Sequence, residues 1–261
     1  MKDETKEEFI TVKNISVIWR QSQRKFREAW AKEIAANFDT DKFDPPVVTL
    51  PNGQGLYHCV EGQHRVAAVR IAFGDNEKLR CRMVNASDPA RAAEIFLGIN
   101  SGRKAIKPVE RFLVAVTAKR EPETTINRLV NKMNYRISSA KTDFCISAVS
   151  ALIKVHQRQG YDVLCATLLM LDKSWHGDAT AFQGDMIMGY AVFLNEFGPQ
   201  INTARLIDVM PKVFSPNQLI VAARTYSEQH KCTLLEGMSE VLRAKYNGGR
   251  GMKDKDKLKK R

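Results

Sequence analysis

Apolar and polar residues alternate in short runs over the first hundred positions, a pattern typical of strands that bury one face. The first run, "FITVKNISVIW" at residues 9–19, predicts a strand. Three later runs have strand composition and lie next to glycine, proline or charged residues. They are "PPVVTL" at 45–50, "GLYHCVEG" at 55–62 and "KLRCRMV" at 78–84.

Between these runs the apolar spacing changes to the period of a helix. The segment "SQRKFREAWAKEIAANF" at 22–38 has an apolar residue at every fourth position, and Ser22 is placed to cap it. We expect these apolar side chains to form a core stripe and not a surface for stacking bases. The stripe consists of Phe26, Trp30, Ile34 and Phe38.

Three more helices are predicted in the first half of the chain. "HRVAAVRIAF" at 64–73 ends at Gly74, and "DPARAAEIFLGI" at 88–99 has Asp88 as a cap with Pro89 at its first position. "KPVERFLVAVTAK" at 107–119 follows. Strands and helices therefore mix over this half.

Strand patterns fade after about residue 105, and helical periodicity replaces them. It is present at 143–160, 181–198, 203–214, 215–229 and 233–246. We therefore predict an α+β fold in which a small α/β domain precedes an all-helical domain. The expected divisions are an acidic lead at 1–8, the mixed domain at 9–115, the helical domain at 116–246 and a flexible basic tail at 247–261.

Charge changes this picture mainly at the C-terminus. The net charge is +12, of which residues 243–261 contribute +7 with nine Lys/Arg and two Asp. The glycine-rich start of this segment predicts mobility, and its lysines are candidates for contacting DNA phosphates. These candidates are Lys253, Lys255, Lys257, Lys259, Lys260 and Arg261.

The composition also argues against several classes of protein. No run approaches the roughly 18–20 apolar residues of a membrane span, and the charged start "MKDETKEE" does not resemble a secretory signal. The five cysteines are far apart and lack metal-ligand spacing, so we expect buried, reduced thiols and no zinc site. We expect a cytoplasmic protein of a bacterial host cell, with no membrane partner.

The stretch "YHCVEGQHR" carries the candidate chemistry. A strand leads into Gly62, and a helix follows directly. A helix N-terminus presents unpaired N–H groups and a partial positive charge, and glycine allows a sharp turn close to a ligand. His64 and Arg65 add donors for a phosphate, while Glu61 is a candidate base or metal ligand. A turn whose arginine pairs with a structural carboxylate would fit these residues equally well.

The order of these segments resembles the N-terminal domain of the ParB/sulfiredoxin superfamily over about residues 9–115. The likeness rests on "RQSQRKF", "LYHCVEGQHRVAAVR" and "IFLGINSGRKAIKPVERF". It is closest to ParB-like proteins of phages and mobile elements that carry Asp/Glu-Gly-Gln-His-Arg at this turn.

The resemblance implies a nucleotide site. In ParB the Gly-Glu-Arg-Arg turn holds a nucleoside triphosphate, and here Gly62 and Arg65 match while Gln63 and His64 depart. The ParB Gln-x-Arg segment is matched by residues 21–24 with a shift of one. The ParB Glu-Asn segment is matched loosely by Ile99-Asn100, followed by Arg103. The implied site comprises Arg24, Gly62, Gln63, His64, Arg65, Asn100 and Arg103, with a nucleoside triphosphate and Mg²⁺ as cofactors.

Two other branches of the superfamily bear on the chemistry. Sulfiredoxins use Gly-Cys-His-Arg, and Gln63 stands where that nucleophilic cysteine would be, so sulfinic acid reduction is excluded. Free-serine kinases use Asp-Gly-His-His-Arg with ATP or ADP, which is similar to residues 61–65, although no amino-acid pocket is evident.

Three functions follow as hypotheses. The first is a nucleotide- and DNA-binding ParB-like protein of a phage or mobile element, with a second copy of the chain as a further partner. The second is a metal-dependent nuclease or NTPase in which Glu61 is joined by Asp39, Asp41 or Asp44. The third is a non-catalytic interaction protein that keeps the fold. A helix pair at 215–245 is the only candidate for a DNA-reading module.

Overall fold

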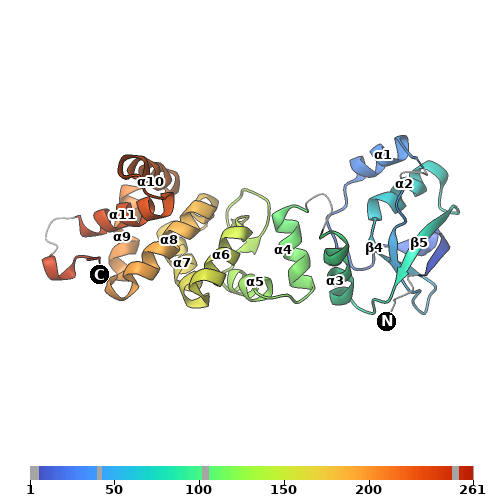
Figure 1. Ribbon diagram of the computed structural model, residues 1–261, viewed down its shortest axis with the longest axis horizontal. Helices are drawn as coiled ribbons and strands as arrows, with labels where there is room; N and C mark the ends of the chain where they lie inside the picture. Colours follow the sequence, from blue (N-terminus) through green and yellow to red (C-terminus); the bar gives the residue numbers. More distant parts are fainter. Residues whose placement is uncertain (1–5, 40–42, 102–105, 249–252, 261) are drawn as a thin grey trace. The chain divides into compact units, whose positions relative to one another are not determined.

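The computed structural model describes residues 6–39, 43–101, 106–248 and 253–260. Its contacts divide the chain into two compact units, Met1–Glu121 and Pro122–Arg261. Each unit is treated by itself below, and Figure 1 shows the order of elements in both.

The first unit is built on a five-stranded sheet with the order β1-β5-β3-β4-β2. The central pairs are β5 with β3, which is parallel, and β3 with β4, which is antiparallel. At the edges β1 pairs antiparallel with β5, and β2 pairs parallel with β4. The strands are β1 (Glu7–Thr11), β2 (Ile15–Ser16), β3 (Val47–Thr49), β4 (Tyr57–Glu61) and β5 (Lys78–Val84).

Helices cover both faces of this sheet because successive strand residues point in opposite directions. Val48 and Cys59 lie in one apolar cluster with Val66 and Val69 of α2. Val47 and Val60 lie in the other, with residues of α3 and α4. The helices of this unit are α1 (Glu28–Ala36), α2 (Gln63–Phe73), α3 (Pro89–Ile99) and α4 (Pro108–Thr117), with short 3-10 helices η1 (Val12–Asn14) and η2 (Arg20–Ser22).

The second unit is a helical array of α5 to α11 in which α8 and α11 pack closely. A Cβ added to Gly189 of α8 would meet the Met238 side chain of α11, so the glycine permits the close approach. Its helices are α5 (Glu123–Lys132), α6 (Val149–Gln159), α7 (Tyr161–Ser174), α8 (Gly184–Phe197), α9 (Thr203–Val213), α10 (Pro216–His230) and α11 (Leu234–Asn247). The 3-10 helices are η4 (Ala179–Phe182), η5 (Gly198–Gln200) and η6 (Asp254–Asp256).

The α+β class is confirmed, and so are the strands and helices predicted between residues 45 and 99. The second unit is not purely helical, because β6 (Arg136–Ile137) and β7 (Cys145–Ile146) form a short parallel pair. Helices α5 and α7 were not predicted, although Ile126, Leu129 and Val130 of α5 stand at helical spacing. The strand predicted at 9–19 is interrupted by η1.

The largest correction concerns the first predicted helix. It begins at Glu28, after an extended Arg27, and Ser22 does not cap it but donates a hydrogen bond to the carbonyl of Trp19. Phe26 therefore lies before the helix and is 44% exposed, while Trp30 is 40% exposed. The predicted core stripe is wrong for these two rings.

Candidate anion-binding site

The turn between β4 and α2 requires glycine at position 62. Gly62 has φ +98° and ψ 19°, in the left-handed region, and serves as the N-cap of α2. A Cβ there would lie 3.0 Å from the Cβ of Pro46 and 3.1 Å from the Arg65 Nη2. The strand-turn-helix geometry predicted for residues 61–65 is therefore confirmed.

This turn aims the N-terminus of α2 into a small cleft of about 280 Å³. The Val66 N–H bonds to the Gly62 carbonyl, so the three preceding N–H groups have no partner within the helix. The cleft is lined by residues 61–65 together with Gln23, Arg24, Trp30, Ile34, Asp44, Phe96 and Asn100. A partial positive charge at the helix end favours an anion there.

Gln63 and His64 turn inward and bind the segment before α1. The Gln63 side chain donates to the carbonyl of Arg24, and the His64 Nε2 accepts from the Arg27 N–H at 3.0 Å. Both side chains are buried, at 6% and 5% exposure. The Gln63 amide and the His64 Nε2 therefore position residues 24–27.

The His64 ring is uncharged in this setting. It stacks on Phe26 with centroids 5.1 Å apart and lies 4.4 Å from the Trp30 ring. Burial, followed by the charges of Arg24 and Arg27, lowers the pKa of His64 to about 4. His64 was predicted as a donor to a phosphate, and its Nε2 here accepts a hydrogen bond from the backbone instead.

Two further ties hold the same segment against β4. The Gln23 side chain donates to the carbonyl of Cys59 at 2.6 Å, and the His58 Nδ1 accepts from the Ile18 N–H at 3.0 Å. Burial lowers the pKa of His58 to about 4. The polar residues of "YHCVEGQHR" thus fasten residues 18–27, a role that sequence spacing could not reveal.

Arg65 is engaged by a carboxylate instead of standing free. Its Nη2 forms an ion pair with Glu61, and its Nη1 donates to the carbonyl of Asp44. The side chains of Arg65 and Glu61 are only 16% and 13% exposed. Arg65 was expected to be exposed, and its pairing with Glu61 is the structural alternative that the sequence left open.

Arg24 and Asn100 come together at the same cleft, as the resemblance implied. The Arg24 Nη2 donates to the Asn100 Oδ1 at 3.1 Å, and the Asn100 Nδ2 donates to the Phe96 carbonyl at 2.8 Å. The Arg24 guanidinium lies 5.8 Å from the centres of the Trp30 and Phe96 rings. Arg103 lies outside the described residues.

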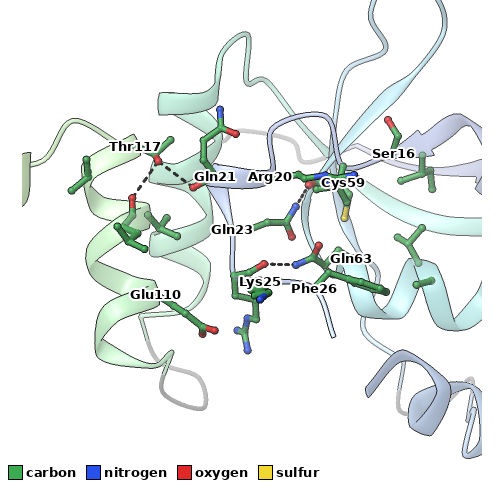
Figure 2. Close-up of a pocket in the computed structure, with 18 of the residues that line it drawn as sticks. Ser16, Arg20, Gln21, Gln23, Lys25, Phe26, Cys59, Gln63, Glu110 and Thr117 are labelled. Carbon is green, nitrogen blue, oxygen red and sulfur yellow. Dashed lines mark hydrogen bonds between the residues drawn. The ribbon is translucent and has the colours of Figure 1, made fainter. Parts of the chain in front are cut away.

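A second, larger cleft of about 1060 Å³ adjoins the first and was not foreseen (Figure 2). Gln23, Arg24 and Gln63 line both clefts. The larger one also has cations at Arg20, Lys25 and Arg70, a carboxylate at Glu110, and apolar side chains from α2 and α4. Phe26 forms part of its wall.

The carboxylates do not gather as a metal centre in the part of the chain that the structure describes. There, no group of three or more His, Cys, Asp or Glu side chains is placed to hold an ion. Asp44 and Glu61 line the small cleft, but Glu61 already pairs with Arg65. Magnesium is commonly held by one or two carboxylates together with substrate phosphates, so these residues fit Mg²⁺ only as an ion that accompanies phosphate. Asp41 lies outside the described residues.

The cysteines near the turn are structural. Cys59 and Cys81 are fully buried. Burial raises the pKa of both thiols, that of Cys81 to about 12. Neither thiol can take the place of the nucleophilic cysteine that sulfiredoxins carry at the position of Gln63.

The basic C-terminal segment packs on the helical unit where it is described. Leu258 is 1% exposed, and Asn247 exchanges two hydrogen bonds with its backbone. Lys260 forms an ion pair with Glu240, and Lys257 with Asp254 at 2.5 Å. Residues 253–260 are therefore packed on the helical unit, whereas the sequence predicted a flexible tail. The side chain of Lys255 and all of Arg261 lie outside the described residues.

The candidate DNA-reading helix pair exists but is poorly placed for a groove. Helices α10 and α11 are joined by a short turn at 231–233, and both begin with capping boxes. However, α11 is buried over Gly237–Leu242, and a Cβ at Gly237 would meet the Ala223 carbonyl at 2.6 Å. A recognition helix needs an exposed face, which this stretch of α11 lacks.

A family model described as a family of unknown function, DUF6551, matches residues 19–255. The chain belongs to this family. The match includes the turn at residues 61–65 and most of both units. No match is found among curated proteins.

Solved structures with some likeness to this family member are of ParB from Caulobacter crescentus. A C-terminally truncated ParB complexed with CTP-gamma-S is 16% identical, with a TM-score of 0.31, over 71% of this chain and 97% of that one. A truncated ParB complexed to the centromeric parS site is 14% identical, with a TM-score of 0.33, over 91% and 99%. Likenesses of this size carry no ligand over to this chain. Within the described residues, no helix has the length and apolar character needed to cross a membrane.

Proposed function

We propose that this chain is a ParB-like, DNA-associated protein that binds the phosphates of a nucleotide, with Mg²⁺ as their companion ion, at the N-terminus of α2. One observation carries the proposal: the left-handed Gly62 opens α2 onto a cleft that also holds the Arg24 guanidinium. Three helix N–H groups and an arginine converge there, and such groups together favour a phosphate.

The charge environment of Arg24 supports its role as the principal cation of the proposed phosphate site. The Arg24 side chain donates a hydrogen bond to the neutral amide of Asn100, whereas Arg65 forms an ion pair with the carboxylate of Glu61. An arginine on a neutral partner keeps its net positive charge for an incoming anion. The aromatic rings of Trp30 and Phe96 beside it limit its motion.

The adjoining cleft supports a ligand larger than a lone phosphate. It shares Gln23, Arg24 and Gln63 with the small cleft, and its volume is in the range of known ligand sites. A nucleotide whose phosphates lie at α2 therefore has room beside them.

The test is isothermal titration of the full chain with CTP, ATP and GTP in the presence of magnesium. We expect at least one nucleotide to bind, and Arg24→Ala to weaken that binding by tenfold or more because a charge-assisted contact is lost. Arg91→Ala, on an exposed position of α3, is the matched control. Failure of every nucleotide to bind, or equal binding by the two variants, would contradict the proposal.

Glu61→Gln separates this proposal from the metal-dependent nuclease. Neutral glutamine releases Arg65 from its ion pair, so we expect nucleotide affinity to rise several-fold. If Glu61 instead held a catalytic ion or served as a base, the same variant would abolish cleavage of a plasmid in magnesium. No cleavage by the wild type, together with tighter binding by the variant, would leave the nuclease without support.

A further inference from the structure

The segment before α1 presents aromatic rings and cations together on the first unit. Residues 20–27 contain Arg20, Arg24, Lys25 and Arg27 and no carboxylate. Phe26 lies among these cations, and Trp30 follows one turn later on α1. Both rings are about two-fifths exposed, although large apolar side chains usually bury more of their surface.

The two rings are fixed by their neighbours and are not merely loose on the surface. They flank the same histidine, His64, which stacks on Phe26 at an interplanar angle of 18° and lies at 41° to Trp30. Phe26 forms a wall of the larger cleft and Trp30 a wall of the smaller one. Each ring therefore has one side supported by His64 and part of its surface turned toward a cleft.

The charges around the rings suit a polyanion. Arg20 and Lys25 are exposed, and the Arg27 side chain is 54% exposed with only a 3.9 Å ion pair to Glu110. The next carboxylate along the chain, Glu28, pairs with Lys32 at 2.8 Å. Cations that flank supported aromatic faces are the arrangement by which proteins bind unpaired bases and their backbone.

We infer that the surface formed by Arg20, Arg24, Lys25, Phe26, Arg27 and Trp30 binds single-stranded nucleic acid, with unstacked bases on the two rings and phosphates on the cations. Duplex DNA does not fit this role, because its bases are stacked on each other and offer no open face. This surface shares Arg24, Phe26 and Trp30 with the walls of the two clefts, but the inference rests on the exposed rings and stands whether or not a mononucleotide binds.

The test is fluorescence anisotropy of the full chain with a labelled oligothymidine, a labelled oligouridine and a labelled duplex. We expect both single strands to bind more tightly than the duplex, and Phe26→Ala and Trp30→Ala each to weaken them roughly tenfold. Phe9→Ala removes a ring that is 70% exposed on β1, and we expect it to leave the affinity unchanged. A difference between the two oligonucleotides would identify the DNA or RNA form of the partner.

Two further measurements keep the result interpretable. Phe26→Leu retains apolar bulk without an aromatic face, so it should reproduce the loss even if Phe26→Ala unfolds. Titration of the wild type with mononucleotides separates the two proposals, because binding of single strands without binding of any mononucleotide would contradict only the nucleotide site. Equal affinity of Phe9→Ala, Phe26→Leu and Trp30→Ala for single strands, or equal binding of duplex and single strand by the wild type, would overturn the inference.

Discussion

Two regions of the chain concentrate the positive charge that sequence associates with phosphate: the cleft at the start of α2 and the basic segment at 253–260. At the cleft, Arg24 is held by a neutral amide and the backbone is shaped by Gly62. In the basic segment, Lys257 and Lys260 are balanced by Asp254 and Glu240 of the same unit. By net charge per residue alone, the second region would be the better candidate for binding phosphate. The first region is the better candidate once the fixed position of Arg24 and its neutral partner are taken into account.

Ion-pair partners within the chain therefore determine whether a basic side chain can bind a phosphate. Surface ion pairs contribute little to stability, but each one lowers the charge that a lysine can offer a phosphate. The N-terminus of α2 carries a partial positive charge of its own, and Gly62 supplies no side-chain cap for its N–H groups. The following predictions probe this contrast.

The largest effect is expected from Gly62→Ala. The left-handed backbone and the 3.0 Å approach to Pro46 make alanine strained there, so we expect a loss of about 2 kcal/mol or more in the free energy of unfolding. Gly55→Ala is the matched control, because Gly55 has φ +72° but nothing within 4 Å of its added Cβ. Urea denaturation of both variants gives the comparison, and equal losses would mean that Pro46 does not restrict the turn.

A second effect on stability is its dependence on pH. The folded pKa of His64 is about 4, below the ordinary value of 6.5, so on acidification the unfolded chain gains a proton first. Stability is therefore full above about pH 6.5 and falls toward pH 4, by at most about 1.4 kcal/mol per pH unit for each such histidine.

His64→Gln is the variant that isolates this contribution. It keeps an acceptor for the Arg27 N–H and should reduce the slope between pH 6.5 and pH 4, while His58 maintains the remainder. Denaturant titrations across this range provide the measurement, and an unaltered slope in His64→Gln would show that the ring is charged in the folded state.

The smallest effect is expected from the basic segment. Because Lys257 and Lys260 are paired, their joint replacement by alanine should lower duplex DNA affinity by threefold or less and leave its salt dependence nearly constant. Anisotropy over a series of salt concentrations tests this. A fall in the slope of about two would mean that both lysines contact phosphates after all.

The sequence predicts the parts of this molecule that depend on neighbouring residues. The turn at Gly62, the capped start of α3 at Asp88 and the strands β3, β4 and β5 follow from local periodicity and turn chemistry. The class of fold follows from their order.

The parts that depend on distant residues were missed. The pairing of Arg65 with Asp44 and the ties from Gln63 and His64 to residues 24–27 join positions 21 to 39 apart in the chain. Period-four spacing likewise placed Phe26 on a helix, because nothing local marks the extended Arg27 that precedes α1. The residue types of the candidate site could therefore be named, but not which of them face a ligand.

The hydrogen bond from the Arg27 amide to the His64 ring has a consequence for how the site assembles. This amide lies at the N-cap of α1, where amides ordinarily exchange quickly with solvent, yet its acceptor is a buried ring 37 positions further along. Its exchange rate with deuterium therefore reports whether the segment carrying Arg24 has docked on the turn. The exchange rate of this one amide thus shows whether the cleft has formed, and the measurement needs no ligand.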